Sequence, residues 1–385
     1  MIKNVVIAGA GLGGLATAIA LRRHGIDARI YEKARELRPV GAGLSLAPNG
    51  LTALEAIVPG IVGSLKVLGS EVSSARVRKS NGDLIAENSI TFLAKYRQPM
   101  LNIRWSFLQE TLAAFLEPGV VHLNRRLTGF EQNKDKVEIV FDNGEKVTAD
   151  LLIGADGINS AVRQSLAGDG PPRYAGRLSW RAVIRYEHAL LRPNEVTFMA
   201  GPDGKNFAIF DVGGGYIFWS AGALSSDDSV SGNAAEAKRR VQQVFAGWAS
   251  PADTILEATD AANIVERPIY DRMPLTGWSR GRVTLLGDAA HAMVPALGQG
   301  ANTAFEDAGE LAQLLARQPG VEEALARYDT SRIYRTQIIH ARSALQGNRY
   351  YEPDVEKFVR GVLEQANADQ TAFEDWLYSY IPPVH

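Results

Sequence analysis

Three glycines near the N-terminus, Gly9, Gly11 and Gly14, have the spacing Gly-x-Gly-x-x-Gly, with which a backbone turn can bind phosphate groups. They follow the apolar stretch NVVIA, whose β-branched side chains predict a strand buried on both faces. The residues LGGLATAIALRRH then predict a helix that is stopped by Gly25. In such a unit the first glycine permits a tight turn, the second lets the backbone approach a pyrophosphate, and the third lets helix and strand pack closely. The start of the helix offers free N–H groups to the same phosphates.

The second predicted strand, DARIYEKA, carries an acidic residue at its end. Glu32 lies 18 residues beyond Gly14, a spacing that suits a hydrogen bond from an adenosine ribose 2′-hydroxyl and disfavours a 2′-phosphate. Strand, glycines, helix, strand and acid together are a strong indication of a dinucleotide site, but they do not separate NAD from FAD. A membrane helix or signal peptide is the weaker interpretation, because the uncharged run Val5–Leu21 is short and contains four glycines.

Two later stretches repeat the change from an apolar strand to a turn with glycine and aspartate. DLLIGADGINSAVRQSL, residues 150–166, places Asp156 after a predicted strand and before a helix. GRVTLLGDAAHAMVPALGQGAN begins at Gly281 and places Gly287 and Asp288 after another strand. The segment Pro295–Gly300, with the pattern Pro-x-x-Gly-Gln-Gly, then leads into a helix that we expect to begin between 301 and 303. These turns predict one nucleotide site that is assembled from distant parts of the chain.

With these motifs the chain resembles the single-component FAD-dependent aromatic hydroxylases, the p-hydroxybenzoate hydroxylase-like flavoprotein monooxygenases. Zeaxanthin epoxidase and salicylate hydroxylase belong to the same superfamily. The match consists of GxGxxG, GADGxxSxVR and GDAAHxxxPxxGQGxN, in the order and spacing of that family. The resemblance implies an α/β fold: a Rossmann-like FAD-binding domain with an inserted antiparallel-sheet substrate domain and C-terminal helices. It also implies FAD as the cofactor and NAD(P)H as a co-substrate that docks transiently.

The resemblance implies a role for each matching position. Glu32 would bind the adenosine ribose, Arg104 would reach the phosphate–ribityl region, and Asp156 would lie where FAD and NAD(P)H phosphates pass. Asp288 would approach the ribityl chain, and residues 295–302 would line the isoalloxazine ring, where helix N–H groups can stabilise negative charge on a reduced flavin. The residues implied to bind the cofactor are Gly9, Gly11, Leu12, Gly14, Glu32, Lys33, Arg104, Asp156, Gly287, Asp288, Pro295, Gly298, Gly300, Ala301 and Asn302.

The elements that must position these residues fall into separated segments. We expect the FAD-binding domain to comprise residues 1–70, 101–172 and 274–346, the substrate domain 71–100 and 173–273, and a C-terminal helical segment 347–385. Antiparallel strands are predicted for RLSWRAVIRY, NEVTFMAG, NFAIFDV and YIFWSAG, and a hairpin for SSARVRKSNGDLIAENSI. Because adjacent residues of a strand point to opposite faces, at most about half of the apolar candidates can line a substrate pocket. These candidates are Phe198, Phe207, Ile209, Phe210, Phe218 and Trp219.

Several single residues have a structural interpretation that we favour over a functional one. His291 is expected to be a packed, hydrogen-bonded residue rather than a catalytic base, and Trp180 to pack in a core. Arg163 is expected to anchor the start of its helix, although a place near NAD(P)H stays open. No catalytic residue is assigned.

Composition excludes several classes of function. The 385 residues include 41 basic and 43 acidic side chains, so no strong basic field is available for nucleic acid. The chain has no cysteine, which excludes a thiol nucleophile, disulfides and iron–sulfur clusters. We expect no metal site, no transmembrane segment, a cytoplasmic location, and a monomer or homodimer.

The expected activity is that of an FAD-dependent monooxygenase. It would use NAD(P)H and O₂ to hydroxylate or epoxidise an aromatic or polyene substrate through a C4a-hydroperoxyflavin. Urate-hydroxylating members of the resembled family place an Asp beside this proline, whereas Ala296 and Leu297 follow Pro295 here, so this departure disfavours urate. The apolar pair mildly favours an apolar or aromatic substrate. Tyr186, Tyr216, His188 or a water chain could deprotonate a phenol. The alternatives are an FAD-dependent reductase of an unsaturated substrate, an FAD-binding protein with only NAD(P)H oxidase activity, and a nicotinamide-dependent dehydrogenase.

Overall fold

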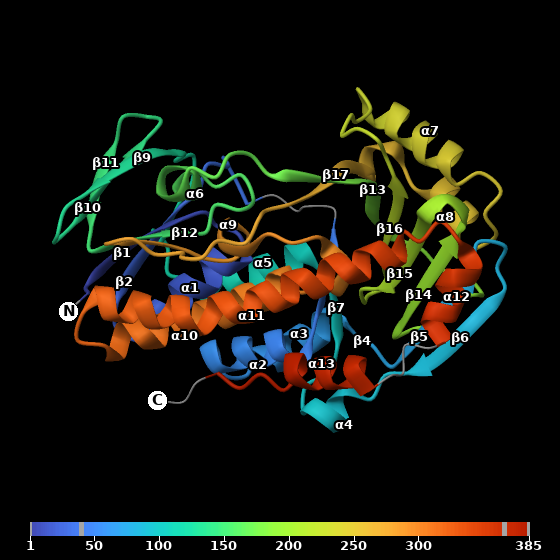
Figure 1. Cartoon of the computed structure of the whole chain (residues 1–385), viewed down its shortest axis with the longest axis horizontal. Coiled ribbons are helices and arrows are strands. Elements are labelled where there is room, and N and C mark those ends of the chain that lie inside the picture. The colour runs from blue at the N-terminus through green and yellow to red at the C-terminus, as the bar shows by residue number, and fades with distance from the viewer. Residues whose placement is uncertain (1, 38–41, 364–367, 383–385) are drawn as a thin grey trace.

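A parallel sheet of five strands forms the centre of one half of the molecule (Figure 1). The computed structural model describes residues 2–37, 42–363 and 368–382. The parallel sheet has the order β18-β12-β1-β2-β8. Its strands are β1 (Asn4–Ala8), β2 (Asp27–Tyr31), β8 (Val121–His122), β12 (Leu151–Gly154) and β18 (Val283–Leu285). Apolar runs that are far apart in the sequence are therefore adjacent strands, which confirms the α/β class with a Rossmann-like sheet.

Helix α1 (Leu12–Arg23) follows β1 and packs on α10 (Gly300–Arg317). A Cβ atom on Gly13 would lie 2.9 Å from Leu286 Cδ2 and 3.1 Å from Ala304 Cβ, so the missing side chain lets the two helices approach closely. The start of α10 is thereby held near the first glycine turn. Further elements of this half are α5 (Trp105–Ala113), α6 (Ala161–Ala167), and a three-stranded sheet of β9 (Leu127–Gln132), β10 (Val137–Phe141) and β11 (Lys146–Ala149).

A second small sheet connects the two halves of the molecule. It has the order β3-β7-β4, with β3 (Gly43–Leu46), β7 (Leu101–Arg104) and β4 (Ser70–Glu71). The register pairs Ser45 with Asn102, and their side chains are hydrogen-bonded at 2.6 Å. Between these strands in the sequence lie α2 (Pro48–Ile57), α3 (Ile61–Leu68) and α4 (Phe92–Tyr96).

The other half of the molecule contains a mixed sheet of seven strands in the order β17-β13-β16-β15-β14-β5-β6. Its strands are β5 (Ser74–Lys79), β6 (Leu84–Ser89), β13 (Arg173–Arg185), β14 (Glu195–Gly201), β15 (Lys205–Asp211), β16 (Tyr216–Leu224) and β17 (Val265–Asp271). The predicted hairpin joins it, but β5 pairs with β14 in parallel, so the sheet is not wholly antiparallel. Between β6 and β13 the chain passes through the other half of the molecule, and this long connection allows β14 to run parallel to β5. Helices α7 (Ala234–Val244) and α8 (Ala252–Ala258) cover one face.

A long helix connects both halves. Helix α11 (Val321–Tyr350) runs beside α10 and extends to the mixed sheet (Figure 1). It passes without a break through the boundary predicted between 346 and 347. The remaining helices are α9 (Asp288–His291), α12 (Val355–Leu363) and α13 (Ala368–Tyr378). Residues 364–367 and 383–385 of the predicted C-terminal segment lie outside the described residues. Within the described ranges, every helix is too short or too polar to cross a bilayer.

Candidate functional site

The three glycines of the first turn have different environments. Gly9 has φ +105°, and a Cβ atom there would lie 2.4 Å from the Ala155 carbonyl oxygen. A Cβ atom on Gly14 would lie 2.1 Å from the Gly9 carbonyl oxygen. Both positions exclude a side chain because backbone atoms occupy the space. Gly11 is different, because its φ is −69° and a Cβ atom there would meet nothing within 4 Å. Gly11 therefore faces open space at the start of α1, whose first turn has no side-chain cap.

Glu32 is held beside this turn. Its Oε2 accepts a hydrogen bond from the Ala10 N–H at 2.8 Å, and its Oε1 accepts one from the Ala34 N–H at 2.8 Å. Buried Gln109 on α5 donates to the Ala10 carbonyl at 3.1 Å, so Ala10 is fixed from both sides. The contact from Gln109 was not predicted from the sequence, because this residue belongs to none of the recognised motifs. Lys33 is exposed at the same edge.

Asp156 has its carboxylate engaged at the start of α6. It accepts hydrogen bonds from Ser160 Oγ and from the Ala161 N–H, the latter at 2.7 Å. Burial raises the pKa of Asp156, although these hydrogen bonds oppose the shift. Arg163 is fully buried and donates to the carbonyls of residues 289 and 290 and to the Asp169 carboxylate. Arg163 thus fixes α6 to α9, as an anchoring residue should.

The third turn combines an acid with an uncapped helix start. Gly287 has φ +61° and precedes the first residue of α9, Asp288, whose side chain is exposed. A Cβ atom on Gly300 would lie 3.6 Å from Asp288 Oδ1, which places the carboxylate beside the start of α10. That start carries no side-chain cap and no acidic residue in its first turn. Its N–H groups are therefore available to an electron-rich ligand.

Asn302 holds the loop in front of α10. It is fully buried, its Oδ1 accepts from the Ala47 N–H at 2.9 Å, and its Nδ2 donates to the carbonyls of Ser45 at 3.1 Å and Gly298 at 2.8 Å. Pro295 and Gly298 of the same loop are exposed, and Ala301 is half-buried. The contact of segment 45–50 with this loop was not predicted from the sequence, in which Pro-Asn-Gly at 48–50 indicates only a turn. Gly50 has no room for a side chain, because a Cβ atom there would lie 2.0 Å from Asn302 Oδ1.

Asn302→Ala should destabilise the protein by about 1–3 kcal/mol, because buried donors and acceptors lose their partners. Unfolding in urea measures the change. Asn88→Ala, at an exposed position of β6, is the matched control and should change the free energy of unfolding by less than about 0.5 kcal/mol. Equal effects of the two substitutions would contradict the role of Asn302 in holding the loop.

Arg104 lies between two aromatic rings at the junction of the halves. Its guanidinium carbon is 3.5 Å from the centre of the Phe107 ring and 4.3 Å from that of Tyr216. The buried Arg104 Nε has no hydrogen-bond partner, and neither have Gln299 Nε2 and Asn49 Oδ1 beside the start of α10. Unsatisfied buried polar atoms of this kind are rare in folded proteins, and a bound ligand or an ordered water supplies the missing partner. The donor set and the open glycine turn fit a flavin dinucleotide.

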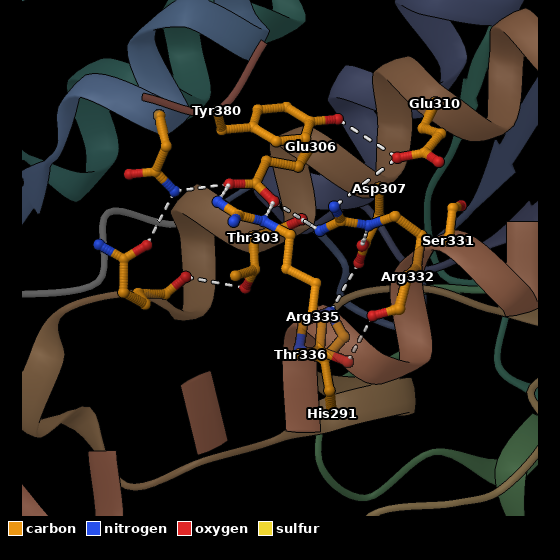
Figure 2. A network of polar contacts seen from close by, with 12 residues as sticks. His291, Thr303, Glu306, Asp307, Glu310, Ser331, Arg332, Arg335, Thr336 and Tyr380 are labelled. Carbon is orange, nitrogen blue, oxygen red and sulfur yellow. Dashed lines mark hydrogen bonds and ion pairs between the residues drawn. The ribbon is translucent and has the colours of Figure 1, made fainter. Parts of the chain in front are cut away.

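A buried ionic network stabilises α10 behind this loop (Figure 2). Arg332 of α11 pairs with Glu306 at 2.7 Å and with Asp307 at 2.8 Å, and Arg335 pairs with Glu306 at 2.7 Å. His291 Nε2 lies 2.6 Å from Asp307 Oδ2, so this histidine is a packed, hydrogen-bonded residue, as expected. Burial alone would raise the pKa of both carboxyls, but the cationic partners outweigh it and the pKa values of Glu306 and Asp307 are lowered. In the part of the chain that the structure describes, no group of acidic or histidine side chains is arranged to bind a metal.

The mixed sheet divides the apolar candidates as strand alternation requires. Phe207, Ile209 and Trp219 are buried against α7 and α8, together with Trp180. Phe198, Phe210 and Phe218 are half-buried on the opposite face. A Cβ atom on Gly43 would lie 2.6 Å from Phe218 Cβ, so β3 contacts this face directly.

The three candidate bases, Tyr186, Tyr216 and His188, line one cavity. Tyr186 and His188 are stacked at 6.2 Å and line a cavity of about 670 Å³ with Ile209 and Ile217, residues of the face turned toward α7. Tyr216 also lines this cavity, and its ring contacts Arg104.

Comparisons with known proteins agree with this geometry. A family model described as an FAD binding domain matches residues 3–343. The chain is 34% identical to aurachin C monooxygenase/isomerase of Stigmatella aurantiaca over 86% of this chain and 85% of that protein. It is 32% identical to 3-amino-4-hydroxybenzoate 2-monooxygenase PtnB3 of Streptomyces platensis over 98% and 96%. The crystal structure of Klebsiella pneumoniae HpxO complexed with FAD and uric acid is similar with a TM-score of 0.90 and 26% identity, over 98% of this chain and 97% of that one.

Proposed function

The chain belongs to the family of FAD-dependent monooxygenases, and from this membership we propose that it oxygenates an electron-rich aromatic or polyene small molecule with NAD(P)H and O₂. The observation that carries the proposal is the convergence of the glycine turn at 9–14, Asp288 and the uncapped start of α10 on one site. Bound FAD supplies the redox and oxygen-activating chemistry there. A metal or a protein nucleophile is not needed for it.

The residues of this chain have three tasks in the proposed reaction. The open backbone at Gly11 and the start of α1 would receive the pyrophosphate, and Glu32 the adenosine ribose. The N–H groups at residues 300–302 would stabilise negative charge on the flavin ring without reorganisation, because Asn302 and the ionic network hold them in place. The half-buried face of the mixed sheet, with Phe210 and Phe218, would orient the substrate and keep water away.

Two further assignments belong to this proposal. We place the enzyme in the cytoplasm, which suits a chain without cysteine and a reaction that consumes NAD(P)H. A monomer or a homodimer is expected. The small-molecule substrates named for the relatives support a small organic substrate here as well.

The proposed function is tested with purified, FAD-loaded protein. Loss of NADH or NADPH is followed together with oxygen uptake and product formation over a panel of phenols, polycyclic aromatics and polyenes. We expect one substrate class to accelerate NAD(P)H oxidation and to yield about one oxygenated product per NAD(P)H. Hydrogen peroxide as the only product with every compound would indicate an oxidase, reduction of a polyene without oxygen uptake would indicate a reductase, and failure to bind FAD would exclude the entire proposal.

A further inference from the structure

A small cavity lies between α9, α11 and the segment that precedes β18. Its volume of about 10 Å³ is enough for one water molecule. Polar side chains from these three parts of the chain line it, and they are Trp278, His291, Thr336, Gln337 and His340. Apolar side chains complete the lining, and they are Pro274, Leu275 and Ala290. This cavity shares no lining residue with the cavity of about 670 Å³.

Three nitrogen atoms of residues in this lining are buried without a hydrogen-bond partner. They are Trp278 Nε1, His291 Nδ1 and His340 Nε2, and the three residues are 1%, 5% and 8% exposed. The centres of the Trp278 and His291 rings are 5.4 Å apart. Because nearly all buried polar atoms of folded proteins are hydrogen-bonded, three unpartnered nitrogens around one cavity indicate a shared partner inside it.

Trp278 and His291 require opposite properties of that partner. The indole N–H of Trp278 can only donate a hydrogen bond. His291 Nε2 lies 2.6 Å from Asp307 Oδ2 (Figure 2), so a neutral His291 carries its proton on Nε2 and donates it to this carboxylate. Its Nδ1 is then unprotonated and can only accept. The partner must therefore accept from Trp278 and donate to His291.

His340 can bind to the same partner. Asp271 Oδ2 lies 3.6 Å from His340 Nε2, which is too far for a hydrogen bond, and the Asp271 carboxylate already pairs with Arg173 at 2.7 Å. Burial has the largest influence on His340 and lowers its pKa, so this ring is neutral at about pH 8. A nitrogen of a neutral imidazole either donates or accepts, and Nε2 therefore suits a partner that can do both.

Only a molecule with both donors and acceptors meets these requirements. A cation cannot accept the indole proton, and a simple anion cannot donate to His291 Nδ1. A water molecule does both, and it has a further donor and a further acceptor for His340 Nε2. Buried waters in proteins typically make about three hydrogen bonds, which matches the three nitrogens around this cavity.

The cavity is connected to the expected flavin-binding turn through Asp307. Besides the proton of His291 Nε2, Asp307 Oδ2 accepts the Gly287 N–H at 3.2 Å. Gly287 precedes Asp288, which is expected to approach the ribityl chain. The orientation of the His291 ring therefore affects the backbone of this turn, and a molecule bound in the cavity holds the ring by its other nitrogen.

We propose that the cavity binds one ordered water molecule, which accepts a hydrogen bond from Trp278 and donates one to His291, and that His291 thereby positions the Gly287 turn for FAD. The water site follows from the described side chains alone. The effect on FAD rests on the proposed function, because it requires the turn at Gly287 and Asp288 to bind the cofactor. His291 is a positioning residue, since it acts on this turn through Asp307.

The wild-type, FAD-loaded protein tests the water site. A high-resolution crystal structure should show one water molecule within hydrogen-bond distance of Trp278 Nε1, His291 Nδ1 and His340 Nε2. Histidine-selective ¹⁵N NMR at about pH 8 should show the proton of His291 on Nε2. An empty cavity, a metal ion in the cavity, or a proton on His291 Nδ1 would overturn the proposal.

Trp278→Phe removes the donor to the water and keeps an aromatic ring. The matched control is Trp219→Phe, because the Trp219 indole is equally buried and donates to Thr259 Oγ1 at 3.0 Å in the core of the mixed sheet. Both variants lose one buried hydrogen bond, so the melting temperature of the apoprotein should fall in both. Only Trp278→Phe should also bind FAD about 3- to 10-fold more weakly in a fluorescence titration. Equal FAD affinities of the two variants would refute the link to the cofactor.

Two substitutions of His291 test its hydrogen bond to Asp307. In His291→Gln the side-chain amide can still donate from nearly the position of Nε2, whereas in His291→Asn the amide is too short to reach Asp307. His291→Asn should therefore bind FAD about 10-fold more weakly than wild type, and His291→Gln should stay within about 3-fold. A histidine that only fills space would give two variants with the same affinity, and this result would refute positioning by His291. If the wild-type protein takes up no FAD, the proposed function fails, and the crystal structure and NMR spectrum of the apoprotein still decide the water site.

Discussion

Gly11→Val should fold like wild type and lose at least about 100-fold in affinity for FAD, the largest functional effect expected here. Gly11 has an ordinary φ of −69°, and a Cβ atom there meets no protein atom within 4 Å. The added side chain would therefore occupy only the space in which we place the pyrophosphate. Fluorescence titration of the apoprotein with FAD measures the affinity, and thermal unfolding of the apoprotein measures the fold.

The matched comparison is Gly14→Ala. A single methyl group there would lie 2.1 Å from the Gly9 carbonyl oxygen, so strand and helix must separate and the apoprotein itself should be destabilised. The two variants thus separate a glycine required by the ligand from a glycine required by packing. If Gly11→Val binds FAD as tightly as wild type does, the glycine turn is not the pyrophosphate site.

Arg332→Met should lower the free energy of unfolding by about 3–5 kcal/mol, the largest effect on stability expected here. Arg332 is 1% exposed, and its removal would leave the carboxylates of Glu306 and Asp307 buried without their shared cation. Arg327→Met on the same helix is the control, because the exposed pair with Glu323 should contribute at most about 0.5 kcal/mol. Urea unfolding gives both values, and similar losses for the two variants would refute a stabilising role of the network.

The same carboxylates predict the sign of the response to pH. The pKa values of Glu306 and Asp307 are lowered in the folded protein, so the unfolded chain binds protons first as the solution is acidified. Their contribution is fully present above the ordinary pKa values of these side chains and is lost as the pH falls toward the lowered ones. We expect the free energy of unfolding to decrease from about pH 5 downward, and to decrease less steeply in Glu306→Gln. A steeper decrease in this variant would contradict the assignment.

The strand, glycine turn and helix at 4–23 and the strands at 151–154 and 283–285 were predictable, because local patterns determine them. His291 was correctly interpreted as a packed residue, but its partner Asp307 was not named, because the contact joins the end of α9 to the second turn of α10. The segment 45–50 and Gln109 were missed, since their contacts with Asn302 and Ala10 depend on residues far away in the chain. The parallel pairing of β5 with β14 was missed for the same reason.

The sequence by itself determined the class of this protein: a dinucleotide fold with three glycine-bearing turns in the order of the FAD-dependent monooxygenases. It did so because a close backbone approach requires glycine at fixed spacings, and such spacings are local. Only the tertiary structure decided which face of each strand is turned toward the flavin loop and which charges find partners. Arg327 and Arg332 lie on the same helix and are alike in the sequence, but packing buries Arg332 against Glu306 and Asp307 and leaves Arg327 exposed in its pair with Glu323, and pairing of that kind is a property of the packed chain.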